Sequence, residues 1–145
     1  MAAWLRTLRE YVLLVTFLNF FWEILQLPLY TIWYDESNRA ILFAVLHCTA
    51  GDVLIAVFCL ILSLLLQGSP EWPHKRFNAV ALGTILFGVG YTIYSEWHNT
   101  IVTRAWGYAA AMPELFGIGL APVAQWIIVP SVIFWWLHRR SIAPQ

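Results

Sequence analysis

Four stretches of this chain are long and apolar enough to cross a lipid bilayer, and they constrain its fold more than any other feature. They cover roughly residues 11–34, 41–66, 77–97 and 115–137. A helix rises 1.5 Å per residue, so about 20 residues span the ~30 Å hydrocarbon core. None of the stretches alternates like a β-barrel strand, and a helix satisfies its own backbone in lipid. The sequence therefore predicts an all-α integral membrane protein, with a single four-transmembrane-helix domain over residues 1–145.

The composition agrees with a chain that lives in a membrane. Hydrophobic residues make up 61% of it and charged residues only 11%, whereas soluble domains average about 25% charged residues. Nine Trp, nine Phe and six Tyr suit a protein with two membrane interfaces to line. The formal net charge is zero, which gives no indication of nucleic-acid binding.

The basic residues predict the orientation of the helices. Six of the eight fall in three places that an even number of spans puts on one side of the membrane: Arg6, Arg9, Lys75, Arg76, Arg139 and Arg140. Only Arg39 and Arg104 fall on the other side. Because short cytoplasmic loops are enriched in Lys and Arg, we expect both termini to be cytoplasmic.

Polar side chains interrupt the apolar stretches, and their insertion into a bilayer costs free energy. A charged residue at bilayer depth costs at least ~2.5–3.5 kcal/mol on insertion scales, so such residues are usually functional. Counted along the helices, the following residues lie in the outer halves of the spans or at their outer ends: Asn19, Glu23, Gln26, His47, Asp52, Tyr91, Tyr94, Glu96, His98, Gln125 and Trp126. The cytoplasmic halves are almost purely apolar. The sequence thus predicts a polar cavity in the outer half of the bundle.

Four residues are candidates for acid–base chemistry: Glu23, His47, Asp52 and Glu96. Glu23 shares one helix face with Asn19 and Gln26, at i, i+4 and i+7, just before Pro28, which should kink the helix and open space nearby. Burial away from water would keep its acid form, which suits a proton donor. The alternative is a purely structural hydrogen-bond clasp between helices.

The other polar residues are candidates for substrate binding. On the third span, Tyr91 and Ser95 lie on one face, whereas Tyr94 and His98 lie on another. Trp126, beside Gln125 in mid-span, offers a π-face to a cation. Together with Asn19, Gln26 and Gln125, the residues Tyr91, Tyr94, His98 and Trp126 are therefore expected to contact a ligand.

A metal site is the alternative for part of this set. A zinc site needs three or four protein ligands, and the chain offers four candidates: His47, Asp52, Glu96 and His98. Their spacing matches no ligand motif, however, and Glu96 and His98 diverge by about 200° around a helix. We expect neither a metal nor another cofactor.

Short motifs along nearly the whole chain resemble the EXPERA-domain family, which includes sterol Δ8–Δ7 isomerases. The first span carries a mid-depth acid in EILQLPLYTIWYDE, the third ends with Gly90, Tyr94 and Glu96, and the fourth contains W-x3-P at Trp126 and Pro130. The resemblance implies four helices around a membrane-facing cavity for sterol-like or cationic amphiphilic ligands. It implies that Glu23 is the family's first acid, that Trp126 is its cavity Trp, and that His47 or Asp52 replaces its second-helix acid. The chain has Asn19 where the isomerases have a His.

These observations favour a membrane-embedded acid–base enzyme, and we expect a double-bond isomerase acting on a sterol-, isoprenoid- or other lipid-like substrate. Glu23 would protonate an alkene carbon, and His47 or Asp52 would remove a proton elsewhere. Three alternatives remain open: a lipid- or amphiphile-binding protein without turnover, a metal- or haem-binding membrane protein, and a small subunit of a larger membrane complex. The expected partners are a hydrophobic small molecule, the membrane and a second copy in a homodimer.

Overall fold

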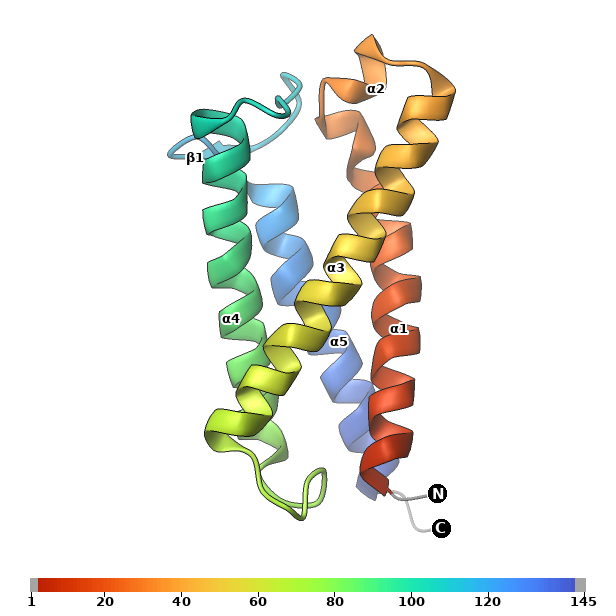
Figure 1. Cartoon of the computed structure of the whole chain (residues 1–145), viewed down its shortest axis with the longest axis vertical. Coiled ribbons are helices and arrows are strands. Elements are labelled where there is room, and N and C mark those ends of the chain that lie inside the picture. Colours follow the sequence, from red (N-terminus) through yellow and green to blue (C-terminus); the bar gives the residue numbers. More distant parts are fainter. Residues whose placement is uncertain (1–2, 143–145) are drawn as a thin grey trace.

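A bundle of four long helices forms the body of the computed structural model, which describes residues 3–142 (Figure 1). They are α1 (Ala3–Gln26), α3 (Asn38–Gln67), α4 (Phe77–Trp97) and α5 (Leu120–Ile142). Helices α1 and α4 each pack against both α3 and α5, so the four form a ring with α1 and α4 on opposite corners. Each is long and apolar enough to cross a membrane. The predicted fold class is confirmed.

The helix bounds correct the sequence-based spans in two places. The first helix begins at Ala3 and ends at Gln26, instead of covering residues 11–34. Pro28 ends this helix rather than kinking it: a 3-10 helix, η1 (Leu27–Leu29), follows, and α2 (Ile32–Asp35) is a separate single turn. The reason is that proline has no N–H to continue the helical ladder.

The other three spans agree more closely. Helix α4 has the predicted bounds. Helix α3 extends by a few residues to Asn38–Gln67, and the hydroxyl of Ser37 caps its start by accepting from the backbone N–H of Ala40 at 3.3 Å. Helix α5 begins at Leu120, because residues 114–119 form a short hairpin of β1 (Glu114–Leu115) and β2 (Ile118–Gly119).

The segment of residues 103–119, here called the cap, closes the end of the bundle that lies away from the termini. It follows a π-helix, η2 (His98–Val102), which extends α4. The backbone of the cap pairs with the linker after α1: Thr31 N–H donates to the Gly107 carbonyl at 3.0 Å, and Ala109 N–H donates to the Leu29 carbonyl at 2.9 Å. Two segments far apart in sequence thus join where α1 and α4 end.

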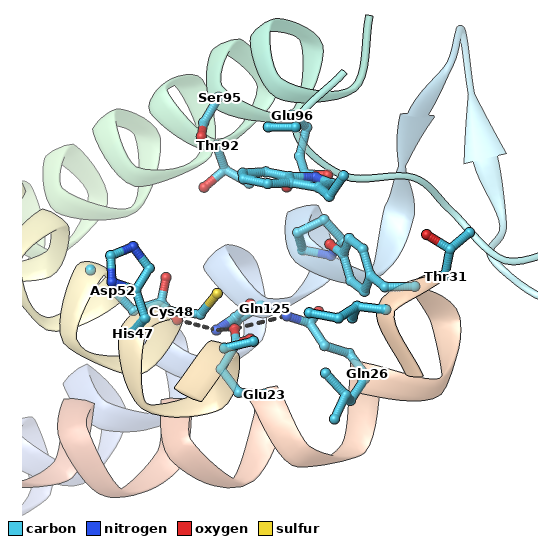
Figure 2. Close-up of a pocket in the computed structure, with 18 of the residues that line it drawn as sticks. Glu23, Gln26, Thr31, His47, Cys48, Asp52, Thr92, Ser95, Glu96 and Gln125 are labelled. Atoms are coloured by element: carbon cyan, nitrogen blue, oxygen red, sulfur yellow. Dashed lines mark hydrogen bonds between the residues drawn. The ribbon is translucent and has the colours of Figure 1, made fainter. Parts of the chain in front are cut away.

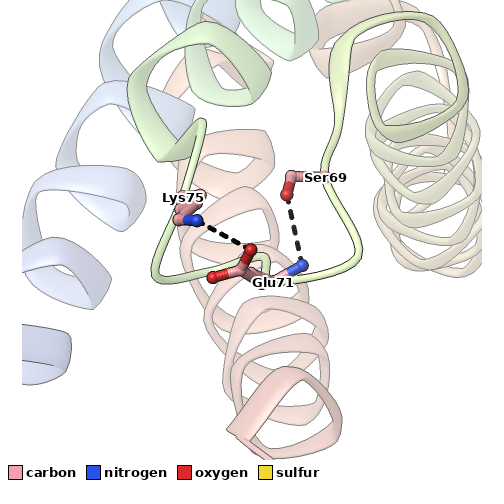
Figure 3. A network of polar contacts seen from close by, with 3 residues as sticks. All are labelled: Ser69, Glu71 and Lys75. Atoms are coloured by element: carbon pink, nitrogen blue, oxygen red, sulfur yellow. Dashed lines mark hydrogen bonds and ion pairs between the residues drawn. The ribbon is translucent and has the colours of Figure 1, made fainter.

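The opposite end of the bundle holds both termini and the α3–α4 loop (Figure 1). Six of the eight basic residues of the sequence lie at this end. Within the loop, Lys75 Nζ lies 2.7 Å from a carboxylate oxygen of Glu71, whose N–H donates to the Ser69 hydroxyl at 3.2 Å (Figure 3). Lys75 and Glu71 are exposed, so their ion pair contributes little to stability. The ion pair and the hydrogen bond to Ser69 both lie within the turn of the loop.

The apolar core fills the half of the bundle nearer the termini. Its largest fully buried side chains include Tyr11, Leu60 and Ile133, from three different helices. The Tyr11 hydroxyl donates to the Ala56 carbonyl at 3.2 Å, so its one polar group is satisfied. The sharp division into an apolar half and a polar half is the division that the sequence predicts.

Close packing of α4 against α5 depends on a glycine. A Cβ placed on Gly88 would lie 2.3 Å from the Trp126 ring, whereas a Cβ on Gly90 of the same helix would meet nothing within 4 Å. The indole therefore rests directly on the α4 backbone, and a larger residue at Gly88 must displace it.

We predict that Gly88→Ala lowers the free energy of unfolding by about 1–3 kcal/mol, the usual effect of overpacking. Gly90→Ala is the matched control and should be neutral or stabilising by up to about 1 kcal/mol, because Ala has the higher helix propensity. Unfolding of both variants in mild detergent measures the difference. Equal stabilities of the two variants would contradict the packing described for Trp126.

Candidate functional site

A cavity of about 770 Å³ opens between the helices, in the half of the bundle that the cap closes. Such a volume lies within the range of small-molecule sites. All four predicted catalytic residues line it, and so do Gln26, Tyr91, Gln125 and Trp126. Figure 2 shows Glu23, Gln26, Asp52 and Gln125 along one wall, with Thr92, Ser95 and Glu96 of α4 on the opposite wall. We call this space the polar cavity.

The side-chain amide of Gln125 joins three helices at one wall of the polar cavity. Its nitrogen donates to Asn19 Oδ1 on α1 and to Asp52 Oδ2 on α3, both at 2.8 Å, and lies 3.3 Å from Glu23 Oε1. Glu23 and Asp52 also contact each other through their carboxyl groups. Gln125 is only 2% exposed. Two acids from different helices are thus held side by side by a single buried amide.

The hydrogen bonds around Gln125 allow only one orientation of the neighbouring amides. The Trp22 indole is a donor only, so the oxygen of Gln26 faces it, at 3.1 Å. The nitrogen of Gln26 then donates to Glu23 Oε1 at 2.8 Å and to Gln125 Oε1 at 3.3 Å. The orientation of the Asn19 amide is fixed because its nitrogen donates to the Val15 carbonyl at 2.9 Å. Gln26 and Gln125 therefore turn their N–H groups towards the acids, whereas Asn19 presents its oxygen to Gln125.

The opposite wall holds a third carboxyl group, on Glu96, which is 6% exposed. The Tyr108 hydroxyl donates to Glu96 Oε2 and accepts from the Gly119 N–H at 2.9 Å. Tyr30 and Trp106 face the same carboxyl group. Burial, and then the nearby Glu96, raise the pKa of both Tyr30 and Tyr108 above the usual value of a phenol. Both hydroxyls therefore stay protonated and remain donors.

His47 lies at the open side of the polar cavity. Its ring is exposed and stacks on Phe43 at a centroid distance of 5.6 Å. Cys48, next to it, also lines the cavity and is exposed. Tyr91 and Ser95 line the facing side from α4, as their common helix face predicts. His47 is thus placed to meet a ligand but makes no hydrogen bond to the acids.

Three predicted binding residues do not line the polar cavity. Tyr94 on α4 and His98 at the start of η2 stack on each other, with ring centroids 5.8 Å apart, and neither lines the cavity. That they contact a ligand stays a prediction, and such a contact would lie outside the cavity lining. Asn19 lies behind the cavity wall and acts through Gln125.

The nominal metal ligands do not come together. Within residues 3–142, no group of three His, Cys, Asp or Glu side chains is arranged to hold a metal ion. His47, Asp52, Glu96 and His98 consequently form no single ligand set in the described part of the chain.

Several lining residues carry no signal in the sequence. Cys48 and Thr92 look like ordinary helix residues, and Tyr30 and Trp106 sit in connecting segments. Tyr30 and Tyr108 meet through a backbone bridge between segments about eighty residues apart. The pairing of the cap with the linker after α1 brings Tyr30 and Trp106 to the cavity, and no local sequence pattern encodes that pairing.

Comparison of the chain with protein-family models, with curated proteins and with solved structures gives no match. The candidate site is therefore defined by its geometry alone.

Gln125 gives a direct test of the network. We predict that Gln125→Met, similar in size but without hydrogen bonds, destabilises the protein by about 1–3 kcal/mol for each buried polar group left unsatisfied, chiefly Asn19 and Asp52. Ser131→Ala on the same helix is the control: its exposed hydroxyl bonds only the Ile127 carbonyl, so the change should stay within about 0.5 kcal/mol. Thermal unfolding in detergent distinguishes them, and a Gln125→Met variant as stable as the control would disprove the role of the amide.

Proposed function

We propose that this protein is a membrane-embedded acid–base enzyme that isomerises a double bond in a sterol-, isoprenoid- or other lipid-like substrate. The observation that carries the proposal is the pair Glu23 and Asp52, two carboxyl groups from different helices that one buried amide holds at the wall of the polar cavity. A relationship to the EXPERA-domain family is part of the proposal, supported by Glu23 on the first long helix and by Trp126 beside the cavity.

The reaction needs one proton donor and one acceptor. Glu23 donates a proton to one alkene carbon, which leaves a carbocation, and Asp52 or His47 removes a proton from a neighbouring carbon to form the new double bond. One proton enters and one leaves, so the step needs no oxidant, reductant or co-substrate. General acid–base catalysis of this kind typically contributes about 10²–10⁴-fold in rate.

The charge distribution of the polar cavity supports a cationic intermediate. Among the described residues that line it, five carry carboxyl groups and none is Lys or Arg. Trp126 adds an aromatic ring, which attracts cations through its π-face. Fixed charges and dipoles in a site with little water stabilise a developing charge strongly.

Glu23→Gln tests the donor. The amide keeps the size and hydrogen bonds of the side chain but has no acid, so we expect the fold to persist and turnover to fall at least about 100-fold. Turnover is measured by incubating the protein with a membrane lipid extract in D₂O and detecting deuterium in the lipids by mass spectrometry, since isomerisation introduces solvent deuterium.

Glu10→Gln is the matched control, on the same helix but paired with Arg140 at 3.4 Å outside the cavity. It should retain the activity. Full deuterium incorporation by Glu23→Gln would remove Glu23 from the mechanism, and none by the wild-type protein would count against isomerisation itself.

Binding of cationic amphiphiles without turnover is the second candidate function. The five carboxyl groups and the absence of Lys and Arg among the described lining residues favour a positively charged ligand over an anionic one. We expect Glu23→Leu to weaken binding of a dodecyltrimethylammonium probe at least about tenfold, because the probe loses a counter-charge in a low-dielectric site. Calorimetric titration measures the affinity. Unchanged affinity would restrict Glu23 to a structural role.

The orientation of the bundle completes the proposal: both termini are cytoplasmic, as the six basic residues at their end indicate. In a background with Cys48 and Cys59 changed to Ala, a cysteine at Ser37 or Thr103 should react with an impermeant reagent added outside cells. A cysteine at His74, in the α3–α4 loop, should not. Labelling of position 74 alone would reverse the orientation.

A further inference from the structure

The hairpin β1–β2 carries an unusual turn. Glu114 pairs with Gly119 and Leu115 with Ile118, so Phe116 and Gly117 alone make the connection. Both have positive φ, 54° and 77°, as a type I′ turn requires at its two central positions. Asn-Gly is the preferred sequence there, and a bulky residue with positive φ is a true outlier. The chain holds a phenylalanine in backbone strain where asparagine would fit with ease.

The strained phenylalanine is also almost fully exposed. The side chain of Phe116 is 93% exposed, the highest fraction among the large apolar residues of the described chain, and its neighbour Leu115 is 57% exposed. Packing within the protein therefore does not explain why these two positions carry large apolar side chains. Because strained backbone positions cluster at functional sites, the exposed and strained Phe116 is a candidate for a function outside the protein's own core.

The position of the hairpin indicates what covers it. The hairpin lies beside the end of α4, on the side away from α1 and α2 (Figure 1). A Cβ on Gly117 would lie 3.3 Å from Cδ1 of Ile101, so the turn rests against the last turn of the span Phe77–Val102. Ile101, Val102 and Trp97 are themselves exposed there. The apolar surface of the hairpin tip continues the lipid-facing surface of that span.

We propose that the hairpin tip, Leu115 and Phe116, is a membrane-interface anchor that inserts into the lipid beside α4. Aromatic side chains at the ends of spans commonly occupy this zone. The anchor also reaches the polar cavity, because the Gly119 N–H at the base of the hairpin donates to Tyr108, the partner of Glu96. Lipid around the tip would thus help to keep Tyr108 beside Glu96. This proposal is independent of the chemistry proposed for the cavity.

A spin label tests the anchor. It is attached to a cysteine at Leu115 in the full-length protein with Cys48 and Cys59 changed to Ala, reconstituted in phosphatidylcholine vesicles. Collisions with oxygen, which concentrates in lipid, are compared with collisions with a water-soluble nickel chelate. We expect oxygen to dominate at position 115, and nickel to dominate at a control label on Glu114, an exposed residue of the same hairpin.

Phe116→Asn sharpens the test, since it creates the preferred Asn-Gly turn and so keeps the hairpin folded. We expect it to preserve or raise thermal stability in detergent, yet to increase nickel accessibility at position 115 severalfold in vesicles. Two results would overturn the proposal. One is equal nickel accessibility at position 115 with Phe and with Asn; the other is protection of position 115 from both reagents, which would mean that protein covers the tip.

Discussion

The need to satisfy buried polar groups without water organises the site half of this molecule. The amide of Gln125 bonds to side chains of α1 and α3 at once, and in lipid those side chains have no alternative partner of comparable strength. Because an unsatisfied buried polar group costs about 1–3 kcal/mol, the three helices are locked in register there. The same bonds that assemble the bundle place two carboxyl groups beside the cavity, so the fold and the candidate site have one cause.

The two halves of the bundle differ in how the helices meet. Near the α3–α4 loop, a Cβ on Gly83 would lie 2.4 Å from the Ser63 hydroxyl, so α3 and α4 pack closely without a cavity. Toward the other end α3 and α4 separate (Figure 1), and Gly51 on α3 meets nothing within 4 Å. Gly83, near the α3–α4 loop, permits close contact between the helices, whereas the polar residues nearer the cap line the cavity. The apolar base supports the polar residues above it, as a site with fixed side-chain positions requires.

Sequence periodicity predicted the four helices, the stripe of Asn19, Glu23 and Gln26, and the half of the bundle that holds the polar residues, because hydropathy and helical spacing are local properties. It placed the start of the first helix too late, since Arg6 and Arg9 looked like flanking residues although a helix can begin before them. It also placed Tyr94 and His98 on another face from Tyr91 and Ser95, and only the latter two line the polar cavity. The contributions of Tyr30, Trp106 and Tyr108 depend on pairing between distant loops, and no local pattern encodes that pairing.

The carboxyl groups of Glu23, Asp52 and Glu96 around the polar cavity are not equivalent. Glu96 faces donors only: Tyr108 bonds it, and Tyr30 and Trp106 lie beside it. These donors hold the Glu96 carboxyl group in place. Glu23 and Asp52 instead contact each other and share the limited N–H groups of two amides, and an amide nitrogen has only two hydrogens to give. An arrangement with more acceptors than donors is completed by a proton on one of the two acids. In the proposed reaction, the transferred proton would therefore come from the pair Glu23 and Asp52, with the Glu96 carboxyl group on the facing wall.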